Sequence, residues 1–362
     1  MDLPVIQPIH DLKNEISLIV NSEHPRLKYE RRGWEKKKTI RHWGQRKLLL
    51  SEMLFLTRWG DLSKKIVYAG AAPGCHITFL SLLFPTHKFI LVDPNPFKIP
   101  ENENIQIING YFTDELAATF KEENVLFISD IRTADWRQMD PAQNEEFIIK
   151  DNNSQINWIQ LMQPAKSMLK FRCPYADVVR GKTKMYRGDI ILQVWPPASS
   201  SETRLIVDDI LEIVEYDNLE YEEQLFYHNN INRYKKYQQP VKGEGLDDNF
   251  DSSAEVIIIA EFLEKFPEYC RGDNILDSIS KFSYQISRQI TDSKRTLATR
   301  MTNPENRRQF PQIDHTVFYS DNQSQLTKGN KKKYCKKNNN NQTYKNNNNQ
   351  TNKNKNMETK KI

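Results

Sequence analysis

The sequence predicts an α/β protein built on a doubly wound, mostly parallel β-sheet flanked by helices. From residue 64 to about 207, short apolar runs alternate with segments of helical periodicity, which is the pattern of successive βαβ units. The apolar run 66–69 leads into a loop of small residues and then into a helical segment. Asp93 ends the next apolar run, where a parallel strand presents its carboxyl end.

Each expected element rests on its local residue pattern. The strands are apolar runs of four to six residues, typical of strands that are buried on both faces. The helices show apolar residues at helical spacing, beginning with the segment that contains Lys47. Strands are expected near 66–69, 88–92, 105–108, 125–129, 167–172, 189–194 and 204–207, and helices near 45–56, 76–84, 145–163 and 254–266.

Charge is divided unevenly along the 362 residues. The formal net charge is +5, but residues 322–362 hold eleven lysines and one glutamate, a charge of +10, so that residues 1–321 sum to −5. This Asn/Lys-rich segment cannot form a core and is expected to be disordered. It either adds non-specific RNA affinity or reflects codon composition alone. We expect an N-terminal extension over 1–27, one domain over 28–320 and a tail over 321–362.

Cysteine spacing and hydropathy argue against several classes of protein. Cys75, Cys173, Cys270 and Cys335 form no C-x-x-C pair, which disfavours a structural zinc site and a disulfide framework. No apolar run approaches the ~20 residues of a membrane span, and the first residues do not resemble a signal sequence. The sequence therefore predicts a soluble, intracellular protein with no metal site and no membrane partner.

The loop 70–74, Gly-Ala-Ala-Pro-Gly, is a candidate cofactor loop. Gly70 and Gly74 are expected to keep side chains off the face where a ligand would lie against the backbone. Asp93 is placed to accept hydrogen bonds from ribose hydroxyls. The loop lacks the three glycines of a dinucleotide fingerprint, so it suits a ligand with an adenosine but no phosphates, of which S-adenosylmethionine is the common one. A plain tight turn is the alternative, and Cys75 and His76 beside it are interpreted as ordinary helix-start residues.

Three ionisable residues stand where an open α/β sheet places its active site. Asp130 closes the apolar run 124–130, and Glu202 opens the run 202–207. Lys170 lies inside a hydrophobic strand, where burying an ammonium is costly unless it is paired. The alternative for each residue is a surface or salt-bridged charge, which is favoured for Glu202 taken alone.

Five sequence blocks occur in one order: Gly-Gln-Arg-Lys-Leu-Leu-Leu-x-Glu (44–52), Val-Tyr-Ala-Gly-Ala-Ala-Pro-Gly (67–74), Ile-Ser-Asp-Ile-Arg (128–132), Leu-Lys-Phe-Arg-Cys-Pro-Tyr-x-Asp (169–177) and Ser-x-Thr-Arg-Leu (201–205). Over roughly residues 28–270 the chain resembles the poxvirus cap-specific mRNA 2′-O-methyltransferases, a family that also serves as the small, processivity subunit of viral poly(A) polymerase. More loosely it resembles the Lys-Asp-Lys-Glu ribose methyltransferases. The resemblance implies a Rossmann-like, S-adenosylmethionine-dependent methyltransferase acting on the ribose 2′-hydroxyl of the first transcribed nucleotide of capped mRNA.

The resemblance also implies roles for individual residues. The catalytic tetrad would be Lys47, Asp130, Lys170 and Glu202. Lys170, crowded by Lys47 and partly desolvated, would accept the proton of the hydroxyl, while the two carboxylates orient the lysines. The cofactor would contact Gln45, Tyr68, Gly70, Gly74, Asp93, Asn95 and Phe112. Asn95 stands where the family has an arginine, so one contact to the adenosine differs.

A positively charged N7-methylguanine is best held between aromatic faces, with carboxylates at its Watson–Crick edge. The cap-binding residues implied by the resemblance are Tyr29, Arg172, Tyr175, Asp177 and Glu222. Trp34 is the rival of Tyr29 for the second stacking position, and a core aromatic is the alternative for Tyr175. Ser199 stands where the family has a further tyrosine, which predicts a weaker affinity for the cap.

Two other functions remain open. One is an accessory subunit that binds RNA and the poly(A) polymerase catalytic subunit, with or without methyl transfer. The other is ribose methylation at internal RNA sites, against which Tyr175, Asp177 and Glu222 argue because such an enzyme needs no methylguanine pocket. The resemblance and the tail composition imply a large cytoplasmic DNA virus, and hence a location in the virion and in the viral factory of the host cytoplasm.

Overall fold

A computed structural model describes residues 7–30, 43–135, 138–208, 210, 212–290 and 296–298. The predicted tail and the rival aromatic Trp34 lie outside the described residues. The strands are β1 (Ile19–Val20), β2 (Lys65–Ala69), β3 (Lys88–Asp93), β4 (Ile105–Asn109), β5 (Leu126–Ser129), β6 (Lys166–Phe171), β7 (Lys182–Tyr186), β8 (Gly188–Ile191), β9 (Thr203–Val207) and β10 (Ile213–Asp217). The helices are α1 (Gln7–Glu15), α2 (Gly44–Trp59), α3 (Ile77–Leu83), α4 (Asp114–Thr119), α5 (Pro141–Met162), α6 (Asn218–Asn230), α7 (Phe250–Lys265) and α8 (Ile275–Gln289), with short 3-10 helices η2 (Asn232–Tyr234) and η3 (Pro267–Tyr269).

An eight-stranded sheet in the order β1-β8-β9-β6-β5-β2-β3-β4 organises the described residues. The strands from β4 to β6 in this order run parallel to one another, whereas β9, β8 and β1 continue the sheet in antiparallel fashion. The strand order reverses direction at β2, as it does in doubly wound folds. The predicted fold class is therefore confirmed.

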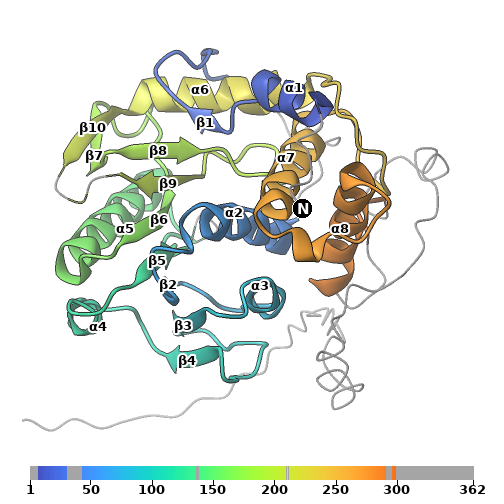
Figure 1. Cartoon of the computed structure of the whole chain (residues 1–362). Coiled ribbons are helices and arrows are strands. Elements are labelled where there is room, and N and C mark those ends of the chain that lie inside the picture. Colours follow the sequence, from blue (N-terminus) through green and yellow to red (C-terminus); the bar gives the residue numbers. More distant parts are fainter. Residues whose placement is uncertain are drawn as a thin grey trace, which may run out of the picture. The chain divides into compact units, whose positions relative to one another are not determined.

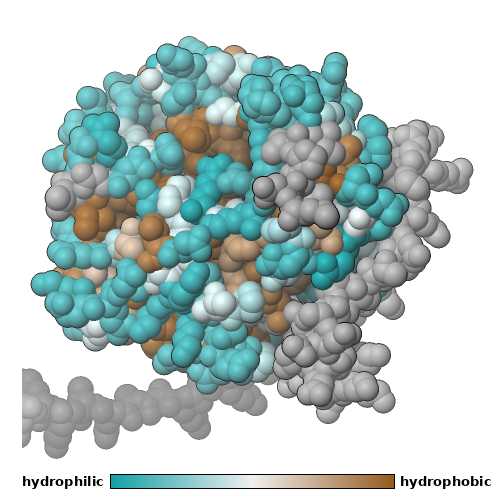
Figure 2. Space-filling model, viewed as in Figure 1, coloured by the Kyte–Doolittle hydropathy of each residue, from teal (hydrophilic) through white to brown (hydrophobic). Residues whose placement is uncertain are grey.

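Helices cover both faces of this sheet (Figure 1). Helices α2 and α3 pack together on one face, α7 packs on α2, and α8 packs on α7, while α4 and α5 pack together on the other face. The parallel strands β2, β3, β5 and β6 are buried at most positions because both faces are covered, whereas the edge strand β4 is mostly half-buried or exposed. Figure 2 shows one face of the molecule as mainly hydrophilic, with several exposed hydrophobic patches.

The predicted elements correspond closely to the observed ones, with a few differences. The seven expected strands match β2, β3, β4, β5, β6, β8 and β9 to within a few residues, and the four expected helices match α2, α3, α5 and α7. β7 and β10 were not expected; they pair with each other in a separate two-stranded sheet. In β7 the exposed Lys182 and Lys184 alternate with buried residues, and in β10 exposed residues alternate with half-buried ones, so neither strand forms a continuous apolar run.

The predicted N-terminal extension, residues 1–27, contains α1 and β1. Ile9 and Leu12 of α1 are each 1% exposed and join the hydrophobic core, and β1 pairs with β8 at the edge of the sheet. A strand of two residues and a helix with two buried apolar side chains leave too short a pattern to be recognised in the sequence. No helix in the described ranges is both long and apolar enough to cross a lipid bilayer.

Candidate active site

The carboxyl ends of the parallel strands lie along one edge of the sheet, and the predicted site residues follow them there. Gly70 comes directly after β2, Asp93 ends β3, and Asp130 follows β5. Lys170 is the last residue but one of β6. Because these four strands are neighbours that run parallel, the topology brings the four residues to the same edge.

The loop after β2 depends on its two glycines. Gly70 and Gly74 have φ angles of +80° and +70°, which glycine adopts without steric cost. A Cβ on Gly70 would lie 2.8 Å from the backbone carbon of Asp130, and a Cβ on Gly74 would lie 3.0 Å from Ile99. The missing side chains thus face neighbouring protein, not the ligand side expected from the sequence. The glycines allow the loop to approach the end of β5 and Ile99 closely.

Asp93 holds this loop and retains capacity for a ligand. Its Oδ2 accepts a hydrogen bond from the Ala72 amide at 3.0 Å, and its Oδ1 accepts two from Asn95, at 2.8 Å from the backbone nitrogen and 3.0 Å from Nδ2. A carboxylate offers about four lone-pair positions, so one on Oδ2 remains for a hydroxyl donor. The carboxylate therefore fits the ribose of an adenosine, and Asn95 braces it in the place where the family has an arginine.

Gln45 and Tyr68 meet a buried polar network behind the loop. The Gln45 Oε1 atom accepts a hydrogen bond from the His76 amide at 3.2 Å. Tyr68 is 1% exposed, and its hydroxyl donates to Glu52 Oε1 at 2.6 Å. Burial and the neighbouring Glu52 carboxylate raise the pKa of the Tyr68 hydroxyl well above its usual value. The Tyr68 hydroxyl therefore serves the interior of the protein.

Phe112 lies at the boundary between β4 and α4 and is buried. Its ring centroid is 5.5 Å from that of Phe127 and 4.9 Å from that of Trp158. The Trp158 indole nitrogen in turn donates to Asp114 Oδ1 at 3.0 Å. Phe112 is thus fixed as an apolar wall next to the end of β4, a position compatible with its predicted contact to the cofactor.

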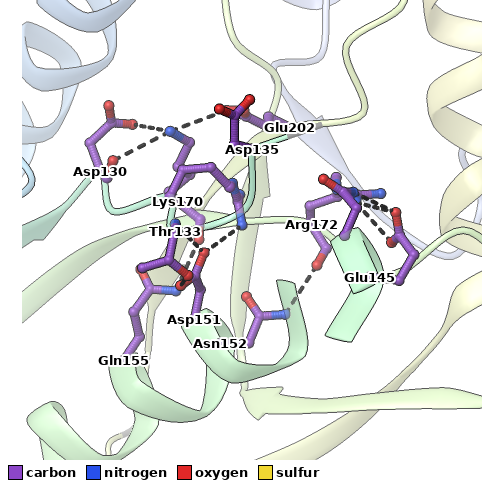
Figure 3. Close-up of polar contacts among 12 residues, drawn as sticks. Asp130, Thr133, Asp135, Glu145, Asp151, Asn152, Gln155, Lys170, Arg172 and Glu202 are labelled. Atoms are coloured by element: carbon purple, nitrogen blue, oxygen red, sulfur yellow. Dashed lines mark hydrogen bonds and ion pairs between the residues drawn. The ribbon is translucent and has the colours of Figure 1, made fainter. Parts of the chain in front are cut away.

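Three members of the predicted tetrad meet where Lys170 lies between Asp130 and Glu202 (Figure 3). Lys170 Nζ lies 3.3 Å from Asp130 Oδ1 and 3.5 Å from Glu202 Oε1, and it also donates to the Asp130 carbonyl oxygen at 3.3 Å. Only 8% of Lys170 is exposed. The ammonium of this buried lysine is therefore balanced by two carboxylates that come from different strand ends.

Arg204 belongs to the same cluster although the sequence analysis gave it no role. Its Nη2 donates to Asp130 Oδ1 at 2.6 Å, and only 2% of Arg204 is exposed. Arg204 is the register partner of Lys170 across the β6–β9 pair, so the two side chains lie on the same face of the sheet. Asp130 thus serves two buried cations.

The charges of this cluster set the ionisation of its carboxylates. Burial alone would raise the pKa of Asp130, but Lys170, Arg204 and Lys47 outweigh burial and hold that pKa well below its usual value. Burial acts in the same direction on Glu202, and there Lys170 and Lys47 lower the pKa to about 2. Both carboxylates are therefore ionised at neutral pH.

Lys47 approaches the cluster from the first turns of α2. Its pKa is lowered to about 8, first by burial and further by the positive charges of Arg204 and Lys170, while Glu202 and Asp130 act against the shift. Among the described residues none accepts a hydrogen bond from Lys47 Nζ. A lysine with such a pKa is partly neutral near physiological pH, which is a property of lysines that transfer protons.

Helix α5 lies on the face of the sheet opposite to α2, and its polar side chains hold the carboxyl ends of β5 and β6 (Figure 3). Asp151 accepts hydrogen bonds from the Thr133 hydroxyl at 2.5 Å and from the Thr133 amide at 3.0 Å. Gln155 donates to the Lys170 carbonyl oxygen at 3.1 Å, and Asn152 donates to that of Arg172 at 3.0 Å. These contacts hold the backbone at Lys170 and Arg172 and the segment that follows β5, and no sequence motif indicated them.

Tyr175 rests on a buried ion pair beyond the end of β6. The Arg172 guanidinium lies 4.5 Å from the centre of the Tyr175 ring. Arg172 donates to both oxygens of Glu145, at 2.7 and 2.8 Å, and Glu145 also accepts a hydrogen bond from the Tyr175 amide at 3.1 Å. Arg172 is therefore committed to Glu145 and to one face of Tyr175. Glu145, at the start of α5, was not foreseen.

Tyr29 lies beside Tyr175, as the resemblance implied. The two ring centroids are 6.1 Å apart with an angle of 35° between the planes, and Phe226 of α6 packs edge-on to Tyr29 at 5.2 Å. A flat base between two rings needs two contact distances of about 3.5–4 Å, or about 7–8 Å in total. The rings would therefore separate by about 1–2 Å to admit a base. Tyr29 is 38% exposed, so it has room for this movement.

The two predicted acids of the cap site differ in exposure. Glu222 of α6 is 5% exposed, and its Oε2 accepts a hydrogen bond from the Ala176 amide at 3.0 Å. Burial raises the pKa of Glu222, and the nearby Asp177 and Glu223 raise it further. Within the described part of the chain, Glu222 Oε1 is buried without a hydrogen-bond partner. Asp177 is exposed. The pair thus offers one open acceptor inside the protein and one at the surface.

The strand order, with a glycine loop and a strand-end carboxylate at the carboxyl edge, defines a Rossmann-like methyltransferase fold. Residues 15–252, about two thirds of the chain, match the model of the poly(A) polymerase regulatory subunit family, and the chain belongs to that family.

Curated relatives bear names that describe an activity. The chain is 31% identical over 219 residues to the cap-specific mRNA (nucleoside-2′-O-)-methyltransferase of Myxoma virus (strain Lausanne), a match that covers 55% of this chain and 64% of the relative. It is 31% identical over 216 residues to the protein of the same name from Fowlpox virus (strain NVSL), with 53% and 68% covered. The match thus spans just under two thirds of the Myxoma relative.

Proposed function

We propose that this protein transfers a methyl group from S-adenosylmethionine to the ribose 2′-hydroxyl of the first transcribed nucleotide of capped mRNA. The observation that carries the proposal is the position of Lys170 between Asp130 and Glu202, at the same sheet edge as Gly70 and Asp93. The names of the Myxoma and Fowlpox relatives support it.

The reaction requires a base for the ribose 2′-hydroxyl and residues that hold the reacting groups in the right orientation. S-Adenosylmethionine, when bound, supplies a methyl group that already carries its leaving group. A ribose 2′-hydroxyl is a weak nucleophile at neutral pH, so a side chain must take its proton as the oxygen attacks. In this proposal the neutral amine form of Lys170 takes that proton and becomes the ammonium that Asp130 and Glu202 hold in place, while Lys47 lies near the same two carboxylates.

Residues at the ends of β2 and β3 would hold the cofactor. Asp93, whose Oδ2 accepts one hydrogen bond from the Ala72 amide, keeps a lone pair that would accept a ribose hydroxyl of the adenosine. Gly70 and Gly74 shape the loop, and Phe112 supplies an apolar wall. Gln45 would contact the cofactor from α2 through its side-chain amide, whereas the buried Tyr68, bonded through its hydroxyl to Glu52, supports the site from behind.

Recognition of the cap uses the surface beyond β6. Tyr175 and Tyr29 stack on the two faces of the methylguanine, and the unpartnered Oε1 of Glu222 accepts from its Watson–Crick edge. Arg172 supports the Tyr175 ring from behind. Asp177, at the surface, adds a second negative charge near the cationic base.

The family match favours a second role as regulatory subunit of a poly(A) polymerase. In that role the chain binds RNA and the polymerase catalytic subunit, and the two roles are compatible because the site at the sheet edge leaves other surfaces free. The proposed place of action, which follows from the resemblance described above, is the virion and the host cytoplasm.

The test is methyl transfer from labelled S-adenosylmethionine to short RNAs that begin with an N7-methylated cap, an unmethylated cap or a triphosphate. Nuclease digestion then locates the label. We expect label on the first ribose, strongest with the N7-methylated cap. Binding of S-adenosylmethionine without transfer to any of the three RNAs would reject the enzymatic proposal and leave the polymerase subunit role.

A further inference from the structure

A buried polar network lies directly behind the loop 70–74, and the proposed reaction does not use it. His76, at the start of α3, and Glu52 of α2 are each 1% exposed, and His76 Nε2 lies 2.8 Å from Glu52 Oε2. On its other side His76 Nδ1 lies 3.0 Å from Gln45 Oε1. Tyr68 donates to Glu52 Oε1 at 2.6 Å. Burying polar side chains is costly unless they form hydrogen bonds, and here Tyr68, Glu52 and both ring nitrogens of His76 have partners.

The pattern of donors and acceptors fixes the hydrogen on His76 Nδ1. The His76 backbone N–H donates to the same Gln45 Oε1 atom at 3.2 Å, so that atom must be the amide oxygen and not the nitrogen. An amide oxygen only accepts. His76 Nδ1, 3.0 Å away, therefore carries a hydrogen and donates it.

The contact between His76 Nε2 and Glu52 needs one hydrogen, which either of the two groups can carry. With Nδ1 protonated, either Nε2 also carries a hydrogen and faces an ionised Glu52, or a protonated Glu52 donates to Nε2. In both cases Nδ1–H continues to point at Gln45. Gln45 thus fixes the hydrogen on His76 Nδ1, and Glu52 holds the ring in place through Nε2.

These hydrogen bonds also orient the Gln45 side chain and its amide nitrogen, Nε2. With Oε1 held by two donors from His76, the Gln45 side chain has one orientation, in which Nε2 is its only remaining hydrogen-bonding group. None of the described residues accepts a hydrogen bond from Gln45 Nε2. That amide is therefore an oriented donor two residues before Lys47.

We propose that His76, held by Glu52, is a positioning residue for the methyl-donor site: it orients Gln45 so that the Gln45 amide donates to the bound methyl donor. This inference rests on the proposed function. From the sequence His76 is interpreted as an ordinary helix-start residue. Its partners Gln45 and Glu52 lie 31 and 24 residues away in the chain, so no local pattern indicates them.

Two substitutions at position 76 separate orientation of Gln45 from packing. Asparagine places its amide nitrogen where Nδ1 was, so His76→Asn keeps the donor to Gln45 and loses the contact to Glu52. Glutamine reaches to the position of Nε2, so His76→Gln keeps the contact to Glu52 and loses the donor to Gln45. Both variants remove the ring, and asparagine, which is one methylene shorter, loses more packing than glutamine, so a loss confined to His76→Gln cannot come from packing.

Calorimetric titration with S-adenosylmethionine and with S-adenosylhomocysteine gives the first measurement. We expect His76→Asn to bind within about twofold of wild type and His76→Gln to bind about tenfold more weakly, the loss of about one oriented hydrogen bond. In transfer assays the same tenfold change should fall on KM for S-adenosylmethionine and leave kcat nearly unchanged. Equal losses in both variants would indicate packing alone and overturn the proposal.

A double-mutant cycle tests whether His76 acts through Gln45. In a Gln45→Ala background, His76→Gln should cause no further loss of affinity, because the oriented group is already gone. Additive losses would contradict the proposal.

The tautomer is measured without any ligand. In protein labelled with 15N-histidine, the His76 resonances should show a protonated Nδ1; a neutral ring protonated only at Nε2 would overturn the inference. The failures are distinguishable. Wild-type protein that binds neither methyl-donor compound refutes the proposed function together with this inference, whereas tight wild-type binding that His76→Gln leaves unchanged refutes the inference alone.

Discussion

Lys170 and Arg204 stand opposite each other in the β6–β9 register, and both reach the carboxylate of Asp130, at 3.3 Å and 2.6 Å. Two like charges directly opposite on one sheet face destabilise a strand pair. The carboxylate between them reverses that effect. The active-site edge of the sheet is therefore held together by the same charges that the proposed reaction uses.

Replacing Asp130 by asparagine keeps its shape and removes its charge. We expect Asp130→Asn to lower the free energy of unfolding at pH 7 by about 2–3 kcal/mol, because Lys170 and Arg204 lose a charged partner. Denaturant unfolding measures this. Asp177→Asn, at an exposed carboxylate, is the control and should stay within about 0.5 kcal/mol of wild type. Equal stability of both variants would mean that Asp130 does not bind the cluster together.

The proposed base is tested on β6 itself. Lys170→Ala should lower kcat for methyl transfer by at least about 100-fold, since it removes the proposed proton acceptor, and should leave affinity for S-adenosylmethionine within about twofold. Lys166→Ala is the matched control: this lysine lies on the same strand but forms an ion pair with Asp208. Substantial transfer by the Lys170 variant would exclude Lys170 as the base.

Lys47 predicts a pH dependence of stability. Its folded pKa of about 8 lies below the usual value for lysine, so between pH 8 and about 10 the unfolded chain binds more protons and stability rises with pH. Below about pH 7 Lys47 is protonated in both states, and the full cost of desolvating its charge is present. Compared with Lys47→Met, the wild type should therefore gain about 1–2 kcal/mol between pH 7 and pH 9.5. Denaturant unfolding at both pH values checks this, and parallel changes in the two proteins would contradict it.

The order of the fold was predictable because the parallel strands are covered on both faces. Burial on both sides requires continuous apolar runs, and such runs are visible in the sequence, as at 66–69 and 126–129. β7 and β10 are half exposed, and charged residues alternate along them. Their pairing depends on contacts between residues 182–186 and 213–217, which no local pattern reports.

The site was predictable only in part, and for a related reason. Asp130 and Lys170 are visible because a charge at the end of, or inside, an apolar strand stands out. Arg204 is not, since an arginine near a strand start has many surface explanations. Glu145 acts through Arg172, 27 residues away, and His76 acts through Glu52, 24 residues away. Pairs so far apart in the sequence can be recognised only once the fold is known.

Stacking on the cap predicts a selective defect. Tyr175→Ala should weaken binding of N7-methyl-capped RNA about tenfold or more, because one aromatic face contributes about 1–3 kcal/mol, and should change binding of uncapped RNA less than twofold. Fluorescence anisotropy with matched capped and uncapped oligonucleotides measures both. Tyr234→Ala, at an exposed tyrosine on η2, is the control and should affect neither RNA. Equal losses for capped and uncapped RNA would refute cap stacking.

Two ion pairs of similar geometry join α2 to α7, one buried and one partly exposed, so their contributions to stability can be compared. Arg46 and Glu255 are both 0% exposed, and Arg46 Nε donates to Glu255 Oε2 at 2.7 Å. Arg58 and Glu261 form a similar two-pronged pair on the same helices, at 2.6 and 2.9 Å, but are partly exposed to solvent. We expect Arg46→Met to cost about 3–5 kcal/mol, because it leaves Glu255 charged in the core, and Arg58→Met to cost about 1 kcal/mol or less.

The buried pair should also show coupling that the exposed pair lacks. The double variant Arg46→Met/Glu255→Leu removes both charges, so its loss of unfolding free energy should be smaller than the sum of the two single losses by about 1–3 kcal/mol. Some loss should remain, since Trp195 Nε1 donates to Glu255 Oε2 at 2.6 Å and would lose its acceptor. Denaturant unfolding of the three variants and of the matched Arg58 and Glu261 set decides the point. Additive losses at the buried pair would show that its two charges do not depend on each other for their place in the core.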